Sequence, residues 1–370
     1  DELRAIDPDG SVIGCHTSID GERMIEGAQD DLVAHLVRRL GSGTQQLHAR
    51  LAQYFTEPIG RDTGSSLDDR YTRAEVAAMH WAAANQPRHA ADAERFAAGL
   101  AEQALAYGEA RDHYRRAIRL FTQLLARSSR NETVYIEDHQ DLLILASCLY
   151  RLGQMTRLAS ERESIGGNGA DPTKYFLQAL KRLEELSANL HDKRQSAPEP
   201  AVVTAVPQRD LPRPNIIRHH IRLCAALSGW IDLELAEWHE LCGDSQRSRE
   251  LLFDALSQAE SARGEADSRW LLVAASVRLA QQLVDDAVEI RFEHPVRAHN
   301  LAIEALYQIE RVINLEAVSP DEDHNLDDPR SRAWMVLGRI FQSLVGDPQL
   351  AEWAFRRMNE HRRDVGDLVD

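Results

Sequence analysis

The stretch SRAWMVLGRIFQSLVGDPQLAEWAFRRM, residues 331–358, contains the spacing that decides the fold. Two patterns of bulky and small residues follow one another in it: Trp334-x2-Leu337-Gly338-x2-Phe341 and Ala351-x3-Phe355-x2-Met358. Each pattern lies on one face of a helix, because positions three and four apart share a side. A glycine on the first helix lets the second approach closely, and aromatic rings fill the space between them. The stretch therefore predicts two closely packed antiparallel helices.

This arrangement resembles the tetratricopeptide repeat (TPR), in which every repeat is one such helix pair. It departs from the repeat at two points: one additional residue precedes Gly346, and Met358 stands where a small residue is usual. The resemblance implies a solenoid, in which stacked helix pairs curve and the first helix of each pair lines the concave side.

Weaker copies of the pattern occur elsewhere in the chain. They are Leu142-x2-Leu145-Ala146-x2-Leu149 before Gly153, Leu235-Ala236 before Gly243 and Ser248-x3-Leu252-x2-Ala255, Ala110-x3-Tyr114-x2-Ala117, and Ala298-x3-Ala302-x2-Ala305. A single copy is typical of any helical core, and the spacing between copies is uneven. Together they predict an all-α fold, a degenerate TPR-like α-solenoid.

A small β-hairpin is expected at the front of the chain. Arg4-Ala5-Ile6 and Ser11-Val12-Ile13 flank Asp7-Pro8-Asp9-Gly10, whose proline and glycine suit a tight turn. We expect residues 1–16 to hold the only strands. From Glu22 to Phe55 the apolar residues, beginning with Met24 and Ile25, follow helical spacing.

The segment that follows the hairpin resembles the end of the winged-helix region in bacterial STAND signal-transduction NTPases. The residues that carry the likeness are Leu47-His48, Arg50-Leu51-Ala52, Tyr54-Phe55 and the helix of residues 75–86. The resemblance covers residues 1 to about 125 loosely. It implies that the hairpin is the wing, that an NTPase core precedes it, and that helical repeats follow. The chain begins with Asp1, and we expect it to be part of a longer polypeptide.

These patterns predict that the chain is divided into four segments. Residues 1–60 are expected to end a winged-helix region or helical arm, and residues 61–190 and 215–370 to hold TPR-like repeats. A loop or linker is expected at 191–214, because five of the thirteen prolines lie there: Pro198, Pro200, Pro207, Pro212 and Pro214.

Composition excludes several classes of protein. The net charge of −16 argues against nucleic-acid binding, because a phosphate backbone repels such a surface and no basic patch is segregated. No apolar run is long enough to span a bilayer, and no signal peptide is found. Four cysteines without a CxxC pair indicate a reduced, cytoplasmic protein.

No catalytic or metal-binding constellation is found. Cys15 and His16 are adjacent in an extended segment, so they point to opposite faces and cannot form a nucleophile–base pair. His219 and His220 diverge on a helix without a third ligand. The acidic run DEDHNLDD, residues 321–328, lacks the glycine and the glutamate of a calcium loop. We therefore expect no enzyme, cofactor or metal in this segment.

The candidate binding residues lie on the expected concave side. The register set by Trp334 places Arg332, Arg339 and Gln342 there. The same register adds two residues from each of two weaker copies: Tyr150 and Arg151, then Glu237 and Glu240. For any one of them, simple solvation of an exposed helix face is the alternative interpretation.

Two functions remain open. The first is the ligand-sensing and protein-interaction region of a bacterial signalling or antiphage-defence STAND NTPase. A protein ligand or partner domain in the groove would then control the upstream NTPase or effector domains, with homo-oligomerisation on activation. The second is a constitutive TPR scaffold that joins an effector to a partner protein. Neither involves nucleic acid or membrane.

Overall fold

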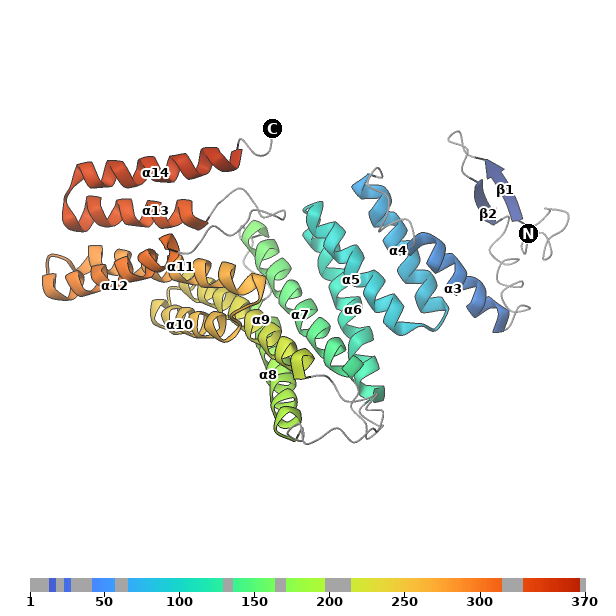
Figure 1. Cartoon of the computed structure of the whole chain (residues 1–370). Coiled ribbons are helices and arrows are strands. Elements are labelled where there is room, and N and C mark those ends of the chain that lie inside the picture. Colours follow the sequence, from blue (N-terminus) through green and yellow to red (C-terminus); the bar gives the residue numbers. More distant parts are fainter. Residues whose placement is uncertain are drawn as a thin grey trace. The chain divides into compact units, whose positions relative to one another are not determined.

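A computed structural model describes residues 13–17, 23–27, 42–56, 66–128, 136–163, 171–196, 214–314 and 329–366. These residues form twelve α-helices, one π-helix and two strands (Figure 1). The α-helices are α3 (Ser42–Thr56), α4 (Leu67–Ala83), α5 (Pro87–Gln103), α6 (Tyr107–Ser128), α7 (Ile136–Glu163), α8 (Thr173–Ser196), α9 (Pro214–Leu241), α10 (Ser245–Ser261), α11 (Ala266–Ile290), α12 (Pro295–Ile313), α13 (Pro329–Ile340) and α14 (Pro348–Gly366).

The chain divides into two compact units, Asp1–Arg127 and Ser128–Asp370. In the first unit, α3 packs on α4 and α4 on α5, around Ala52, Ala77 and Trp81. In the second unit, α7 to α14 form four helix hairpins, and each hairpin packs on the next. The helices α8 and α9, on either side of the proline-rich segment, belong to this one unit. The expected helical, solenoid-like architecture is therefore present.

Three of the turns between helices are built in the same way. They are Ala84–Gln86, Ala104–Ala106 and Cys242–Asp244. In each, the middle residue has a left-handed backbone with φ of 56°, 58° or 81°, and the residue after it donates its N–H to the carbonyl five residues earlier. This Schellman arrangement satisfies the free carbonyls at the end of one helix and reverses the chain into the next.

A small residue follows the turn in five of the helix pairs. Its N–H bonds to the carbonyl four residues earlier, at Ala90, Ala110, Ser248, Ala298 and Ala351. All five are almost completely buried, so each lets its helix approach the preceding one closely. The sequence patterns predicted this position in all of them except the first.

Two glycines mark close contacts with an aromatic ring of the paired helix. A Cβ atom on Gly338 would lie 2.5 Å from the ring of Phe355 on α14, and one on Gly153 would lie 2.4 Å from the ring of Phe176 on α8. The first contact is the one expected between the paired helices. The additional residue before Gly346 is accommodated in a π-helix, η2 (Phe341–Val345), which widens the helix locally.

The Gly153 contact corrects the register that the sequence indicated for α7. That register placed Ala146 in the position of Gly338, but the aromatic ring of the paired helix lies on Gly153. The pattern in α7 is therefore shifted by seven residues. Leu149 and Leu152 stand where Trp334 and Leu337 stand in α13.

The strands differ from those expected. Strands β1 (Ile13–Thr17) and β2 (Arg23–Gly27) pair antiparallel, with Cys15 opposite Ile25. The expectation of strands only within residues 1–16 is therefore wrong, and so is the helical spacing expected from Glu22, because Arg23–Gly27 is a strand. Apart from Ile13, the hairpin expected at residues 4–13 lies outside the described residues.

The helices also extend into both ends of the expected proline-rich loop. Helix α8 continues to Ser196, and Pro214 is the first residue of α9, where its missing N–H costs no hydrogen bond. The rest of residues 191–214 lies outside the described residues, as does the acidic run at 321–328.

One carboxylate is buried in the packing of the second unit. Asp232 on α9 is 7% exposed. Burial, with the nearby charges of Asp254 on α10 and Glu184 on α8, raises its pKa from 3.8 to about 7, although Arg247 on α10 opposes the shift. Folding therefore favours the protonated carboxyl group.

We expect Gly153→Ala to destabilise the second unit by about 1–2 kcal/mol, because overpacking against the fully buried Phe176 outweighs the gain in helix propensity. Gly338→Ala should cost less, since the half-buried Phe355 can move. Gly99→Ala on α5 is the control, with open space around it. It should be neutral or stabilising. Urea unfolding, monitored by circular dichroism, measures how much each substitution destabilises the protein. An equal effect at all three sites would contradict this prediction.

The buried carboxyl of Asp232 predicts a pH-dependent stability. Its folded pKa lies above its unfolded value, so its stabilising contribution is full below about pH 4 and is lost as the pH rises through about 7. Asp232→Asn should remove this dependence and gain on the order of 2–4 kcal/mol at pH 8 relative to wild type. Glu289→Gln, at an exposed site on α11, is the control. If the unfolding free energies of Asp232→Asn and wild type change with pH in the same way between pH 5 and 8, the prediction is refuted.

Candidate functional site

Charged and amide side chains join the first helices of the four hairpins in the second unit. Helices α7, α9, α11 and α13 contact one another in this order (Figure 1). Hydrogen bonds and ion pairs between neighbouring helices connect nine side chains, which we call the ladder: Gln154, Arg157, Glu234, Glu237, Glu240, Arg278, Gln282, Asp285 and Arg339. The helix faces that carry these residues are called the ladder face.

The ladder begins between α7 and α9. The Arg157 guanidinium lies 3.0 Å from Glu234 Oε2 and 3.3 Å from Glu237 Oε2. Gln154 Nε2 donates to Glu234 Oε1 at 2.7 Å and to the hydroxyl of Tyr150 at 2.8 Å. Burial raises the pKa of Glu234, and the charge of Arg157 and the bond from Gln154 oppose that shift. At this end of the ladder, hydrogen bonds and ion pairs therefore join largely buried side chains of α7 and α9.

Glu237 continues the ladder to α11. Its second oxygen, Oε1, lies 3.4 Å from the Arg278 guanidinium. Arg278 Nε also donates to Glu240 Oε2 at 3.1 Å. Gln282 Nε2 donates to the same Glu240 oxygen at 3.2 Å and to Ser248 Oγ on α10 at 2.7 Å. One carboxylate, Glu237, therefore bridges the arginines of two different helices.

The last step joins α11 to α13 and is open to solvent. Arg339 Nη2 lies 2.6 Å from Asp285 Oδ1, and both side chains are more than one third exposed. The ladder thus changes from a buried network at α7 and α9 to an accessible ion pair at α13. An exposed pair contributes little to folding, so its charges are available to another molecule at small cost.

Part of the ladder follows one spacing. Gln154 and Arg157 stand one and four residues after Gly153, and Arg339 stands one residue after Gly338. Glu237 and Glu240 stand one and four residues after the buried Ala236. Residues three apart lie on one face of a helix, so each pair faces the same way. Gln154 and Arg157 would have been found from the sequence if Gly153 had been used to set the register.

The sequence-predicted residues divide into three groups. Glu237, Glu240 and Arg339 belong to the ladder. Arg151 is exposed and donates to Gln154 Oε1 at 3.2 Å. Tyr150 is buried, contrary to the expectation that it lines a groove, because the register in α7 differs. Its ring packs against Phe176, and burial raises its pKa.

Arg332 and Gln342 are exposed, and Gln342 lies in η2. Arg332 precedes Arg339 by seven residues, which is two helical turns, so both can contact one elongated partner. The sequence did not indicate Glu234, Arg278, Gln282 or Asp285, because nothing in the spacing shows which helices become neighbours.

A second polar cluster lies in the first unit. His113 on α6 is almost completely buried, with Nδ1 2.6 Å from Glu94 Oε2 on α5 and Nε2 2.8 Å from the hydroxyl of Tyr71 on α4. Arg116 Nε donates to both Glu94 oxygens at 2.9 Å. Burial, assisted by the charge of Glu109, raises the pKa of Tyr71 to about 12. The phenol therefore stays protonated near neutral pH, and the cluster joins three helices.

The described residues contain no group of three or more histidine, cysteine or acidic side chains arranged to hold a metal ion. None of their helices combines the length and the apolar character that crossing a membrane requires.

Comparison with models of known protein families gives no match, and comparison with curated proteins gives none either. The interpretation of the ladder therefore rests on its geometry and on the residue patterns of the chain.

The two ends of the ladder should respond differently to loss of an arginine. Arg157→Met leaves the buried Glu234 without its counter-charge and should cost about 3 kcal/mol of unfolding free energy. Arg339→Met, the matched change at the exposed pair, should cost less than about 1 kcal/mol. Adding Glu234→Gln to Arg157→Met should restore most of the loss. Urea unfolding of the wild type and the three variants tests this, and equal costs for the two arginines would be inconsistent with the graded burial.

Proposed function

We propose that the second unit is a degenerate TPR-like array that binds a protein partner on the ladder face. Four features support the TPR-like interpretation: paired antiparallel helices, a glycine against an aromatic ring in two of the pairs, a small buried residue after the turn, and stacking of successive pairs. Solenoids of this kind commonly bind their partners on the surface formed by the first helices.

The observation that carries the binding proposal is the ladder itself. Ion pairs between packed helices contribute little more to folding than apolar side chains of the same size would. A row of them along one surface is therefore poorly explained by stability. The bonds between helices hold the charged groups in fixed positions, so a partner that pairs with them loses less conformational entropy on binding. The partner that fits is a protein segment with alternating acidic and basic side chains.

In the wider polypeptide, we propose that this array is the sensor region of a cytoplasmic STAND-type NTPase. The first unit would then be the arm that connects it to the NTPase core. Partner binding would shift the equilibrium toward the active state if the partner binds that state more tightly. The alternative is a constitutive scaffold that links an effector to the partner without switching.

The sequence upstream of Asp1 separates the two proposals. A phosphate-binding loop followed by an acidic Walker B strand would support the sensor, and an unrelated effector domain would support the scaffold. Deletion of residues 128–370 from the full polypeptide would then give a functional readout. In a sensor it should change basal NTP hydrolysis.

Reversing two exposed charges on the ladder face should weaken binding without unfolding the array. We expect Arg332→Glu with Arg339→Glu to lower the affinity for the native partner at least tenfold, because interface arginines often contribute about 2 kcal/mol or more. Calorimetric titration measures the affinity, and thermal melting measures the stability. The partner is the protein recovered by crosslinking to the wild-type chain.

The matched control reverses two arginines on α14, which carries no ladder residue. Arg356→Glu with Arg357→Glu changes the net charge equally, and both side chains are exposed. The control should leave the affinity within about twofold. If both double variants weaken binding alike, the effect is one of net charge. If neither does and both remain folded, the partner binds elsewhere.

A further inference from the structure

Helix α12 has apolar side chains on two faces. Ala298, Ala302 and Ile309 are buried and face the array. On another face, Val296, Ile303 and Tyr307 are 75%, 52% and 59% exposed, and Phe292 in the turn before the helix is 83% exposed. On the helix, Val296, Ile303 and Tyr307 recur at intervals of seven and four, so these three form one stripe along it. Among the described residues, α8 and α10 each expose a single large apolar side chain, which is Leu177 on α8 and Phe253 on α10.

We propose that this stripe binds the same stripe of a second copy of the chain, with the two α12 helices antiparallel. Exposed large apolar side chains gathered on one helix face are typical of an interaction surface. The pattern is complementary to itself about a two-fold axis between Leu301 and Ala302. The axis places Val296 opposite Tyr307 of the second copy, and Asn300 opposite its Ile303. Such closed two-fold contacts are the commonest way in which identical chains associate.

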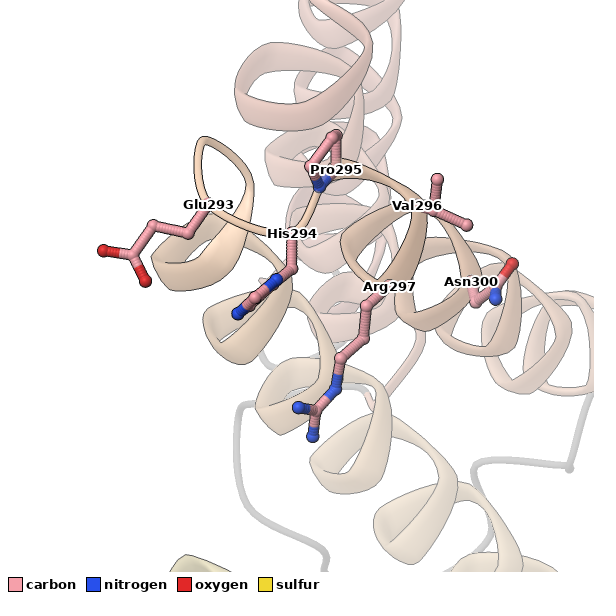
Figure 2. A pocket seen from close by; sticks show the side chains of 6 residues that line it. All are labelled: Glu293, His294, Pro295, Val296, Arg297 and Asn300. Carbon is pink, nitrogen blue, oxygen red and sulfur yellow. The ribbon is translucent and has the colours of Figure 1, made fainter.

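A hollow at the start of α12 fits this pairing. It has a volume of about 480 Å³ and is lined by Glu293, His294, Pro295, Val296, Arg297 and Asn300. Figure 2 shows Val296 and Asn300 together on one side of the helix and Arg297 extending from it. The two-fold axis brings Tyr307 of the second copy to Val296, at this hollow. An aromatic ring with a polar end suits a site with both apolar and polar walls.

The charges beside the stripe are also complementary. Arg297 and Glu304 lie along the same edge of it, seven residues apart. Within the part of the chain that the structure describes, neither side chain takes part in an ion pair. In the antiparallel arrangement, Arg297 lies beside Glu304 of the second copy, and the two-fold axis repeats the pair. A partner of one dominant charge would leave one of the two residues facing a like charge.

The interface is small, because α12 is about 28 Å long at 1.5 Å per residue. We therefore expect a dimer with a dissociation constant in the micromolar range. It does not depend on the proposed function, since the ladder face lies on α7, α9, α11 and α13, and the stripe lies on α12.

Sedimentation velocity of the 370-residue chain from 1 to 200 µM tests the dimer. We expect a concentration-dependent dimer for wild type and a monomer, or at least tenfold weaker association, for Ile303→Glu and for Tyr307→Glu. Leu177→Glu and Phe253→Glu are matched controls on α8 and α10 and should dimerise as wild type does. Circular dichroism establishes that each variant is folded.

Exchange of the paired charges tests the orientation. Arg297→Glu and Glu304→Arg should each weaken self-association, because each brings like charges together. An equimolar mixture of the two single variants should form a heterodimer, since both pairs are then opposite in charge. The double variant should associate as wild type does. A parallel arrangement would not give this recovery.

A wild-type chain that stays monomeric up to 200 µM would overturn the proposal. It would also be overturned by a dimer that Ile303→Glu and Tyr307→Glu leave intact, because the interface would then lie elsewhere. Binding of a different protein to the stripe, with no self-association, counts against it as well.

Discussion

Two helices can approach only as closely as the side chains between them allow, and this constraint organises the second unit. At Gly153 and Gly338 the contact with an aromatic ring leaves no room for a Cβ atom. Small residues after the turns serve the same purpose from the other helix of the pair. Once this position is set on a helix, every other residue has a defined direction. The residues one place further on, Gln154 on α7 and Arg339 on α13, then face the neighbouring hairpin and belong to the ladder.

The first unit meets the same constraint with different chemistry. Glu94 stands four residues after Ala90, the position that Phe355 occupies after Ala351. A carboxylate there is stable because His113 and Arg116 bond to it. Burial would raise its pKa, but those bonds outweigh the burial and lower it. A polar network thus joins α5 and α6 in the first unit, where the second unit has an aromatic ring between α13 and α14.

The second unit presents two chemically different surfaces. The ladder face is charged, and its charges are held by bonds between helices. The stripe of α12 is apolar, with Arg297 and Glu304 at its edge. Because the two surfaces lie on different helices, a partner on one need not displace a second copy from the other. A sensor that binds a ligand and also self-associates would require this separation, while a simple scaffold would require only the first surface.

The sequence by itself determined the helical class, the close contact at Gly338 and the small residues after four of the turns, because helix geometry makes spacing a local property. It could not choose between Ala146 and Gly153 in α7, since small residues seven apart lie on nearly the same side of a helix. Only the position of Phe176 decided that register. Met24 and Ile25 likewise fit a helix or a strand until pairing with β1 is known. The pairing of the ladder residues was decided by tertiary structure alone, because an ion pair such as Arg278–Glu240 depends on which helices become neighbours in space.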